Sequence, residues 1–291
     1  MVKGSITALV TPFKNGEIDD KAFQKHVEWQ IDSGTHGLVP CGTTGSSATL
    51  SDAEHKRVIS LCVEAAAGRV PVIAGAGSNE TRVSIAYSQH AKDLGADAAL
   101  VVAPYYNKPS QEGMYQHFKA IAESVDIPIV IYNVPSRSVV DISNETMGHL
   151  SKLTNVIGCK DATGDISRVA ELIDRCGEDF IQLSGDDPTS LGHSVHGGRG
   201  AISVGSNIAP AAYAEFHNAM LAKDYIKAQA MNQKLDRLHK DLFLCPSPAP
   251  TKHALAIMGR MEPDVRLPIT PCVDSTKFAV AAAMSRAGLA V

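Results

Sequence analysis

The stretch VIGCKDATG, residues 156–164, contains the pattern that decides the fold. It begins with a mainly apolar run that ends at Lys160, and it passes through Asp161 into a short polar loop. Apolar runs without alternation are typical of parallel strands that are covered on both faces. The stretch therefore predicts a buried parallel strand with a lysine at its carboxyl end.

Apolar runs of this kind recur between residue 5 and residue 204. Apolar runs predict eight strands, at residues 5–10, 37–39, 72–74, 98–102, 127–132, 156–160, 180–184 and 201–204. Stretches with helical spacing lie between them, including residues 21–33, 52–67, 81–94 and 113–124. Eight strands that alternate with helices fit a barrel or a doubly wound open sheet, so the count alone does not decide.

The positions of the polar residues favour the barrel. Barrel enzymes carry their chemistry around the carboxyl ends of many strands, whereas an open sheet concentrates it near one switch point. Here unusual residues follow most of the predicted strands: Thr43, Thr44, Tyr105, Tyr106, Tyr132, Asn133, Lys160, Asp161, residues 185–187 and residues 205–206. We therefore predict a (β/α)8 TIM barrel.

The alternation of strands and helices stops near residue 224. Residues 225–244 predict a helix, the stretch PSPAP at 246–250 predicts a break, and residues 251–258 and 274–287 predict further helices. We expect a catalytic barrel over residues 1–224 and a helical C-terminal domain over residues 225–291.

The composition excludes several classes of protein. A chain of 291 residues with 44% hydrophobic and 20% charged residues is an ordinary globular protein. Its net charge of -4 argues against nucleic acid or an anionic membrane as the main partner. No apolar run is long enough to cross a bilayer, the N-terminus lacks a secretory signal, and the six cysteines have no zinc-like spacing. We expect a soluble cytoplasmic protein without a metal site.

Lys160 is the residue with the clearest chemical meaning. A lysine in a barrel mouth is partly desolvated and loses its proton more easily, which makes it a nucleophilic amine for attack on a ketone. An ion pair with Asp161, or a side chain that reaches out to the rim, is an equally good interpretation of the position alone. Tyr132 ends the preceding predicted strand, about 5 Å away in a parallel sheet, and a phenol there can donate and accept protons.

Two loops add candidate binding residues. Residues 42–45 (GTTG) form a turn whose hydroxyls and amides can hold a carboxylate, and without a Walker lysine a phosphate loop is the weaker interpretation. Arg137, after the fifth predicted strand, could receive a second carboxylate, although exposed loop arginines often bind nothing. Neither a zinc-protease histidine pair nor a serine-hydrolase elbow is present.

Four motifs in this order resemble the dihydrodipicolinate synthase family, within the N-acetylneuraminate lyase superfamily. They are residues 42–45 (GTTG), 103–109 (APYYNKP), 132–137 (YNVPSR) and 158–164 (GCKDATG). Residues 266–271 (RLPITP) match as well, so the likeness covers essentially the whole chain. The order and spacing of the motifs make the resemblance specific.

The resemblance implies a reaction and a set of roles. The reaction is the condensation of pyruvate with L-aspartate 4-semialdehyde to 4-hydroxy-tetrahydrodipicolinate, in lysine and diaminopimelate biosynthesis, without a metal or organic cofactor. Lys160 would form the Schiff base with pyruvate, and Tyr132 would be the proton donor and acceptor. A relay would connect Tyr132 through Thr43 to Tyr106, which the neighbouring subunit of a tight dimer would supply.

The remaining roles concern the substrates and the assembly. Thr44 and the backbone near Ile202 would hold the pyruvate carboxylate, and Arg137 would receive the carboxylate of the semialdehyde. The resemblance also implies a homotetramer made of two tight dimers.

Two other functions stay open. Another Schiff-base lyase of the superfamily would cleave a sialic acid or a keto-deoxy sugar acid to pyruvate. Arg137 argues against it, because a sugar aldehyde needs neutral hydroxyl partners. A protein that only binds a keto acid as a sensor is the third interpretation, and the set of Lys160, Tyr132, Thr43 and Tyr106 argues against it.

The chain departs from the family pattern at two positions. Ser46 stands where the family usually has a glutamate after GTTG. Val83 stands where inhibited members have a glutamate that receives the amine of the effector lysine. The other positions of that regulatory site match: Ser47, Ala48, His55, Asn79 and Tyr105.

We predict that L-lysine inhibits this protein weakly or not at all, because Val83 removes the carboxylate that would bind a cation. Steady-state assays over a range of L-lysine concentrations measure this directly. A sub-millimolar inhibition constant for L-lysine would contradict the prediction.

Overall fold

The computed structural model describes residues 2–290, so Met1 and Val291, the ends of the two expected domains, lie outside the described residues. Its centre is an eight-stranded sheet in which the paired strands of the described chain run parallel. The strands are β1 (Gly4–Ala8), β4 (Gly37–Val39), β5 (Ile73–Gly75), β6 (Ala98–Val102), β7 (Ile129–Asn133), β8 (Val156–Asp161), β9 (Ile181–Ser184) and β10 (Gly200–Ser203).

The sheet closes on itself, which confirms the predicted TIM barrel. The strand order is β4-β1-β10-β9-β8-β7-β6-β5, and a parallel bridge between Leu38 and Val72 joins the two ends. Gly158 lets β8 approach β9 closely, because a Cβ at this position would lie 2.2 Å from the carbonyl oxygen of Ile181. A parallel barrel has no free edge, so its backbone groups pair within the ring.

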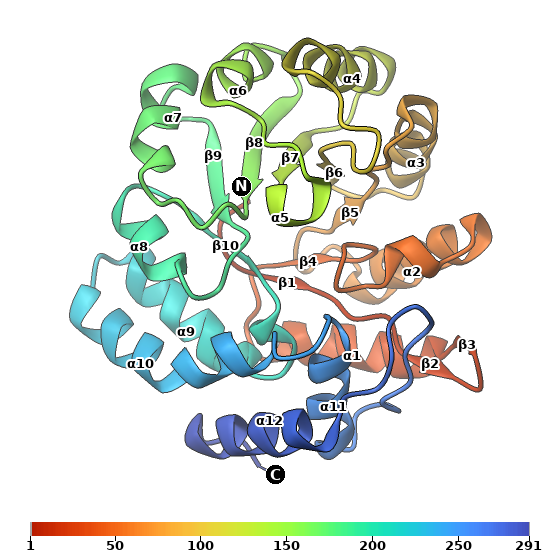
Figure 1. Ribbon diagram of the computed structural model, residues 1–291, viewed down its shortest axis with the longest axis vertical. Helices are drawn as coiled ribbons and strands as arrows, with labels where there is room; N and C mark the ends of the chain where they lie inside the picture. Colours follow the sequence, from red (N-terminus) through yellow and green to blue (C-terminus); the bar gives the residue numbers. More distant parts are fainter. Residues whose placement is uncertain (1, 291) are drawn as a thin grey trace.

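Helices surround the strands, as Figure 1 shows. Those of the barrel are α1 (Asp20–Asp32), α2 (Asp52–Ala66), α3 (Thr81–Asp93), α4 (Gln111–Ser124), α5 (Pro135–Ser138), α6 (Asn144–Leu150), α7 (Arg168–Cys176), α8 (Ser190–Val195) and α9 (Pro210–Leu221). Short 3-10 helices follow two strands, η1 (Ser47–Thr49) and η2 (Gly205–Asn207). The start of α2 is a capping box, in which Ser51 and Glu54 each accept a hydrogen bond from the other's backbone amide.

The last three helices gather on one side of the barrel (Figure 1): α10 (Tyr225–Asp241), α11 (Ala249–Ile257) and α12 (Asp274–Arg286). Their apolar faces share one hydrophobic cluster with Val10, Ile208 and Tyr213 of the preceding chain. Because the cluster spans both parts, the division at residue 224 stays a prediction. No helix within residues 2–290 is both long and apolar enough to cross a bilayer.

The predicted strands agree with the structure within two residues at each end, and two local features differ. A hairpin of β2 (Phe13–Lys14) and β3 (Glu17–Ile18) was not predicted, since strands of two residues carry no periodicity. The predicted break between helices, residues 246–250, extends too far toward the C-terminus, because α11 already begins at Ala249. Pro250 fits there because the first turn of a helix needs no amide donor.

Several histidines are buried in the folded chain without a charged partner. Burial lowers the pKa of His26 and of His193 to about 4, and that of His217 to about 3. His55 and His117 are shifted in the same direction, to about 4. The folded protein therefore keeps these rings neutral at a pH where the unfolded chain protonates them.

We predict that the free energy of unfolding falls as the pH drops from about 6.5 toward 4.5. In this window the unfolded chain binds protons that the folded chain does not, so each such histidine costs about 2 kcal/mol at pH 5 relative to pH 7.5. Urea titrations at fixed protein concentration measure the slope. A free energy of unfolding that stays constant between pH 7 and pH 5 would contradict the prediction.

Candidate active site

Lys160 and Tyr132 lie side by side inside the barrel mouth. They are register partners on β8 and β7, and the Lys160 Nζ sits 4.0 Å from the centroid of the Tyr132 ring. Both side chains are buried, with Lys160 7% and Tyr132 6% exposed. The contact is made with the face of the ring, where a cation is attracted by the π electrons.

The two alternative interpretations of Lys160 do not match this geometry. A 7% exposed side chain does not reach out to the rim. Asp161 does not pair with it either, because neighbouring residues of a strand point to opposite faces. The Asp161 carboxylate instead binds Arg168, whose Nε lies 2.9 Å away, and accepts hydrogen bonds from the amide and hydroxyl of Thr163.

The end of β7 is held from outside the barrel in the same way. The Asn133 Nδ2 donates to Asp141 at 2.7 Å, and its Oδ1 accepts from the Ile142 amide at 3.1 Å. Arg168 joins this group by donating to the Ile142 carbonyl and by pairing with Asp141. The outer side chains of β7 and β8 therefore share one network, which secures the strand ends that carry Tyr132 and Lys160.

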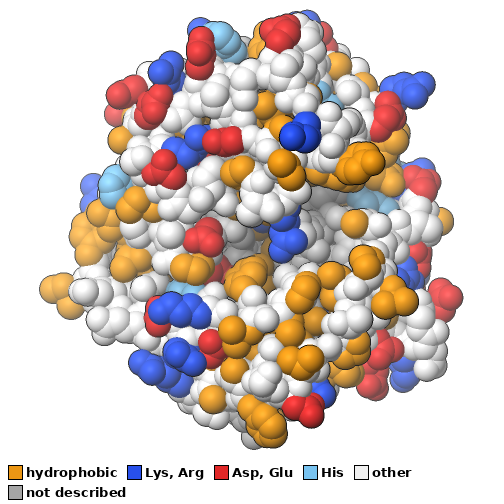
Figure 2. Space-filling view, in the orientation of Figure 1, with side chains coloured by type: hydrophobic (Ala, Val, Ile, Leu, Met, Phe, Trp, Pro, Cys, Tyr) orange, Lys and Arg blue, Asp and Glu red, His pale blue; other side chains and the backbone are white. Residues whose placement is uncertain are grey.

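Lys160 and Tyr132 line a pocket of about 390 Å³, here called the inner pocket. Its lining residues are Thr43, Thr44, Tyr132, Val134, Ser136, Arg137, Lys160, Ala162, Gly185, Asp186, Val204, Phe243 and Ser247. Figure 2 shows a hollow near the middle of this face, with Lys, Arg and apolar side chains at its rim. The structure thus brings together five of the predicted site residues, from the ends of three strands.

The turn that carries Thr43 and Thr44 is held by its own backbone. The amides of Gly45 and Ser47 donate to the Gly42 carbonyl, and the Ser46 amide donates to the Thr43 carbonyl. Ser46 has a φ of 60°, in the left-handed region. The Gly45 carbonyl accepts a hydrogen bond from the Thr11 hydroxyl at 2.7 Å, which ties the turn to the segment after β1.

Two predicted site residues lie apart from the inner pocket. Ile202, on β10, is 1% exposed and packs in the interior cluster with Tyr132, rather than lining the pocket. Tyr106 is 87% exposed with a φ of 74°, and it lines neither of the pockets described in this section. A single chain therefore does not bring Tyr106 to Thr43.

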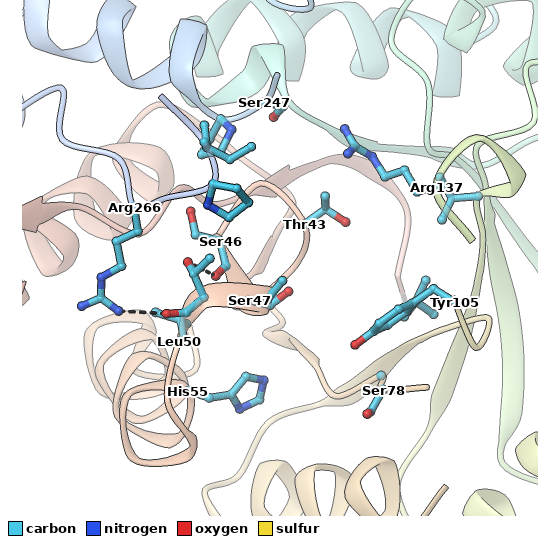
Figure 3. A pocket seen from close by; sticks show the side chains of 18 of the residues that line it. Thr43, Ser46, Ser47, Leu50, His55, Ser78, Tyr105, Arg137, Ser247 and Arg266 are labelled. Carbon is cyan, nitrogen blue, oxygen red and sulfur yellow. Dashed lines mark hydrogen bonds between the residues drawn. The ribbon is translucent and has the colours of Figure 1, made fainter. Parts of the chain in front are cut away.

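A second cavity of about 480 Å³, the outer pocket, adjoins the first and shares Thr43 and Arg137 with it. Figure 3 shows Ser47, His55 and Tyr105 directed around this cavity. Four of the five proposed regulatory residues line it, namely Ser47, Ala48, His55 and Tyr105, together with Val83.

Asn79, the fifth proposed regulatory residue, lies outside the outer pocket, and the charged residues that line this pocket are arginines. Asn79 does not line the cavity, and its carbonyl instead accepts a hydrogen bond from Asn107. The described lining contains Arg137 and Arg266 but no carboxylate. This charge pattern supports the prediction of weak lysine binding, which stays a prediction.

Sequence reasoning missed the C-terminal part of the site. Phe243 and Ser247, which follow α10, reach the inner pocket although they lie more than eighty residues after Lys160 in the chain. The proline-rich stretch at 246–250 was the available signal, since a rigid irregular segment often lines a site. Within residues 2–290 no group of His, Cys, Asp or Glu side chains is arranged to hold a metal ion.

The fold and the site define a (β/α)8-barrel protein with a buried lysine–tyrosine pair in the mouth of the barrel. The family is given by comparison with known proteins. The model of the Dihydrodipicolinate synthetase family matches residues 1–287, and the chain belongs to this family.

Individual relatives cover nearly the full length of the chain. A protein of Bradyrhizobium diazoefficiens named 4-hydroxy-tetrahydrodipicolinate synthase is 55% identical over 287 residues, which are 99% of this chain and 97% of that one. A protein of Phenylobacterium zucineum with the same name is 55% identical and covers 99% and 98%. A crystal structure of the Acinetobacter baumannii dihydrodipicolinate synthase, described as complexed with pyruvate, is 46% identical, covers 100% of both chains and superposes with a TM-score of 0.98.

We predict that Gly185→Ala displaces the Lys160 side chain. The added Cβ would lie 2.9 Å from the Lys160 Cε and 2.8 Å from the Ala162 Cβ, so one of them must move. Small displacements of a reacting group are costly, so trapping of pyruvate on Lys160 by borohydride should slow about tenfold or more. Gly113→Ala, in α4 and outside both pockets, is the control. Trapping at the unmodified rate in a folded Gly185→Ala protein would contradict the geometry.

Proposed function

We propose that this chain condenses pyruvate with L-aspartate 4-semialdehyde to give 4-hydroxy-tetrahydrodipicolinate, the reaction for which its relatives are named. The reaction belongs to lysine and diaminopimelate biosynthesis, and it makes the chain a lyase. The observation that carries the proposal is the buried Lys160 amine above the Tyr132 ring, in a pocket lined by hydroxyls and by Arg137.

The first half of the reaction makes pyruvate nucleophilic. The neutral Lys160 amine adds to the pyruvate ketone, and loss of water from the carbinolamine gives an imine. Tyr132 donates and accepts the protons that these two steps require. The Thr44 hydroxyl and the backbone near Ile202 hold the pyruvate carboxylate. Loss of a methyl proton then gives an enamine, because the imine accepts the electron pair of the broken C–H bond.

The second half of the reaction joins the two substrates. The enamine carbon attacks the aldehyde carbon of the semialdehyde, forming the C–C bond and a hydroxyl group. The amine of the semialdehyde then replaces the Lys160 nitrogen by transimination, which closes the ring and frees the enzyme. Arg137 lies at the junction of the two pockets, where a guanidinium can receive the semialdehyde carboxylate bidentately.

The proton relay requires a second subunit. Tyr106 completes the relay from Tyr132 through Thr43 when a neighbouring chain supplies it, and its 87% exposure supports such a contact. We therefore propose a homotetramer of two tight dimers. One structural relative, 39% identical, is described as a monomeric dihydrodipicolinate synthase variant, so sedimentation of this chain is an informative test.

The site chemistry also supports the assignment of partners and compartment. The net charge of -4 is unfavourable for nucleic acid, and Arg137, which lines both pockets, favours small carboxylates. All six cysteines are free thiols, as expected in a reducing cytoplasm. We propose no cofactor, since the lysine amine supplies the covalent chemistry.

The experiment that tests the proposal is reductive trapping. After incubation with pyruvate and borohydride, peptide mass analysis should find the adduct on Lys160. Lys252 is the internal comparison, because it is also fully buried, and burial lowers its pKa to about 7. An adduct on Lys252, or no adduct, would overturn the proposal.

Two variants and two substrates separate the steps. Lys160→Arg should lower turnover more than about 1,000-fold. Tyr132→Phe should lower turnover about 100-fold or more.

The choice of substrate separates the candidate functions. Pyruvate should disappear when the semialdehyde is added. Cleavage of N-acetylneuraminate with no response to the semialdehyde would favour the sugar-acid lyase. An adduct without turnover of either substrate would favour the sensor.

A further inference from the structure

Arg266, in the loop between α11 and α12, is bound to three separate parts of the barrel. Its Nη1 donates to the Thr49 carbonyl at 3.1 Å and to Glu54 at 2.9 Å. Its Nη2 donates to the Gly16 carbonyl at 2.7 Å and to the other oxygen of Glu54 at 2.5 Å. The guanidinium also lies over the Phe13 ring, 4.2 Å from the centroid.

These contacts show that Arg266 is not available as a ligand-binding residue, although it lines the outer pocket. A guanidinium has five N–H donors. Both terminal nitrogens already make two hydrogen bonds each, so only the Nε donor remains. A residue bound in this way holds protein segments in place.

One of the segments it holds leads directly to the active site. Thr49 ends η1, and its amide and hydroxyl both donate to the Ser46 carbonyl. The Ser46 amide in turn donates to the Thr43 carbonyl. A chain of hydrogen bonds therefore runs from Arg266 through Thr49 and Ser46 to Thr43, which lines the inner pocket beside Thr44 (Figure 3 shows Arg266, Ser46 and Thr43 around the outer pocket).

The second segment is the start of α2. Glu54 accepts from both terminal nitrogens of Arg266 and also caps the helix through the Ser51 amide. The hydrogen bond from Arg266 is the main reason why the pKa of Glu54 is lowered to about 2. Bidentate, partly buried pairs of this kind are stronger and more directional than exposed ion pairs.

The loop that carries Arg266 is anchored from α11. The Nζ of Lys252, a fully buried residue, donates to the Asp264 carbonyl at 2.7 Å and lies 4.0 Å from the centroid of the Phe13 ring. Phe13 thus contacts both cations, one from α11 and one from the loop. The loop is thus held at Asp264 by α11 and at Arg266 by the barrel, which gives Arg266 a defined position.

We propose that Arg266 is a positioning residue that sets the place of the Thr43–Thr44 turn, and through it the binding of the first substrate's carboxylate. This rests on the proposed function. It gives Arg266 an indirect role in the chemistry, through the backbone of residues 43–49 rather than through contact with substrate. Lysine cannot replace arginine here, because a single ammonium cannot bind Glu54, Thr49 and Gly16 in the same geometry.

The test compares Arg266→Ala, Arg266→Lys and Glu54→Gln with Arg57→Ala. Arg57 is the matched control, because it is an arginine of α2 that pairs with a carboxylate, Asp20 at 2.7 Å, but it is exposed and its side-chain hydrogen bonds go to Asp20 and not to the Thr43–Thr44 turn. In the assembled protein, Arg266→Ala should raise the KM for pyruvate about tenfold or more, with a smaller change for the semialdehyde. The KM for pyruvate of Arg266→Lys and of Glu54→Gln should lie between that of the unmodified chain and that of Arg266→Ala. The KM of Arg57→Ala should stay within twofold of the unmodified chain.

Hydrogen exchange supplies a readout that does not depend on turnover. The amides of residues 46–50 should exchange faster in Arg266→Ala than in the unmodified chain, while those of β7 and β8 stay unchanged. Normal exchange in this segment together with an unchanged pyruvate KM would overturn the proposal. If Arg266→Ala does not fold, the same two measurements on Arg266→Lys and Glu54→Gln decide. Failure of the unmodified chain to trap pyruvate would instead count against the proposed function.

Discussion

The parallel pairing of β7 with β8 is the constraint on which the site depends. It sets Tyr132 opposite Lys160 and Asn133 opposite Asp161. The first pair faces the inside of the barrel and the second pair faces the helices. Because alternate residues of a strand point to opposite sides, a shift of β8 by one residue would set Cys159 or Asp161 opposite Tyr132 and turn Lys160 toward the helices. The network of Arg168 outside the barrel therefore secures the arrangement of the two reacting groups inside it.

The electrostatics of the mouth are opposite in sign to those of the molecule as a whole. The chain carries a net charge of -4, yet the inner pocket is lined by two cations, Lys160 and Arg137, and by one carboxylate, Asp186. The Lys160 amine lies over the face of the Tyr132 ring, which attracts a cation. This local excess of positive charge favours small anions in the mouth.

The C-terminal helices complete the site as well as covering one side of the barrel. Phe243 and Ser247 line the inner pocket, and Arg266 holds the segment that leads to Thr43. The hydrophobic cluster shared between α9, α10, α11 and α12 fixes these helices on the barrel. Without this segment the inner pocket would lose the wall that Phe243 and Ser247 form.

The sequence by itself determined the barrel, its strands, and the proximity of Tyr132 and Lys160, because apolar runs and strand ends are local features and parallel neighbours have a known spacing. It left open whether Lys160 would pair with Asp161, and only the tertiary structure decided that Arg168 takes that carboxylate. Only the tertiary structure shows that Phe243 and Ser247 line the inner pocket. It also shows that Arg266 lines the outer pocket and that Asn79 does not. Those contacts join segments far apart in the chain, and side-chain direction in loops follows from packing rather than from periodicity.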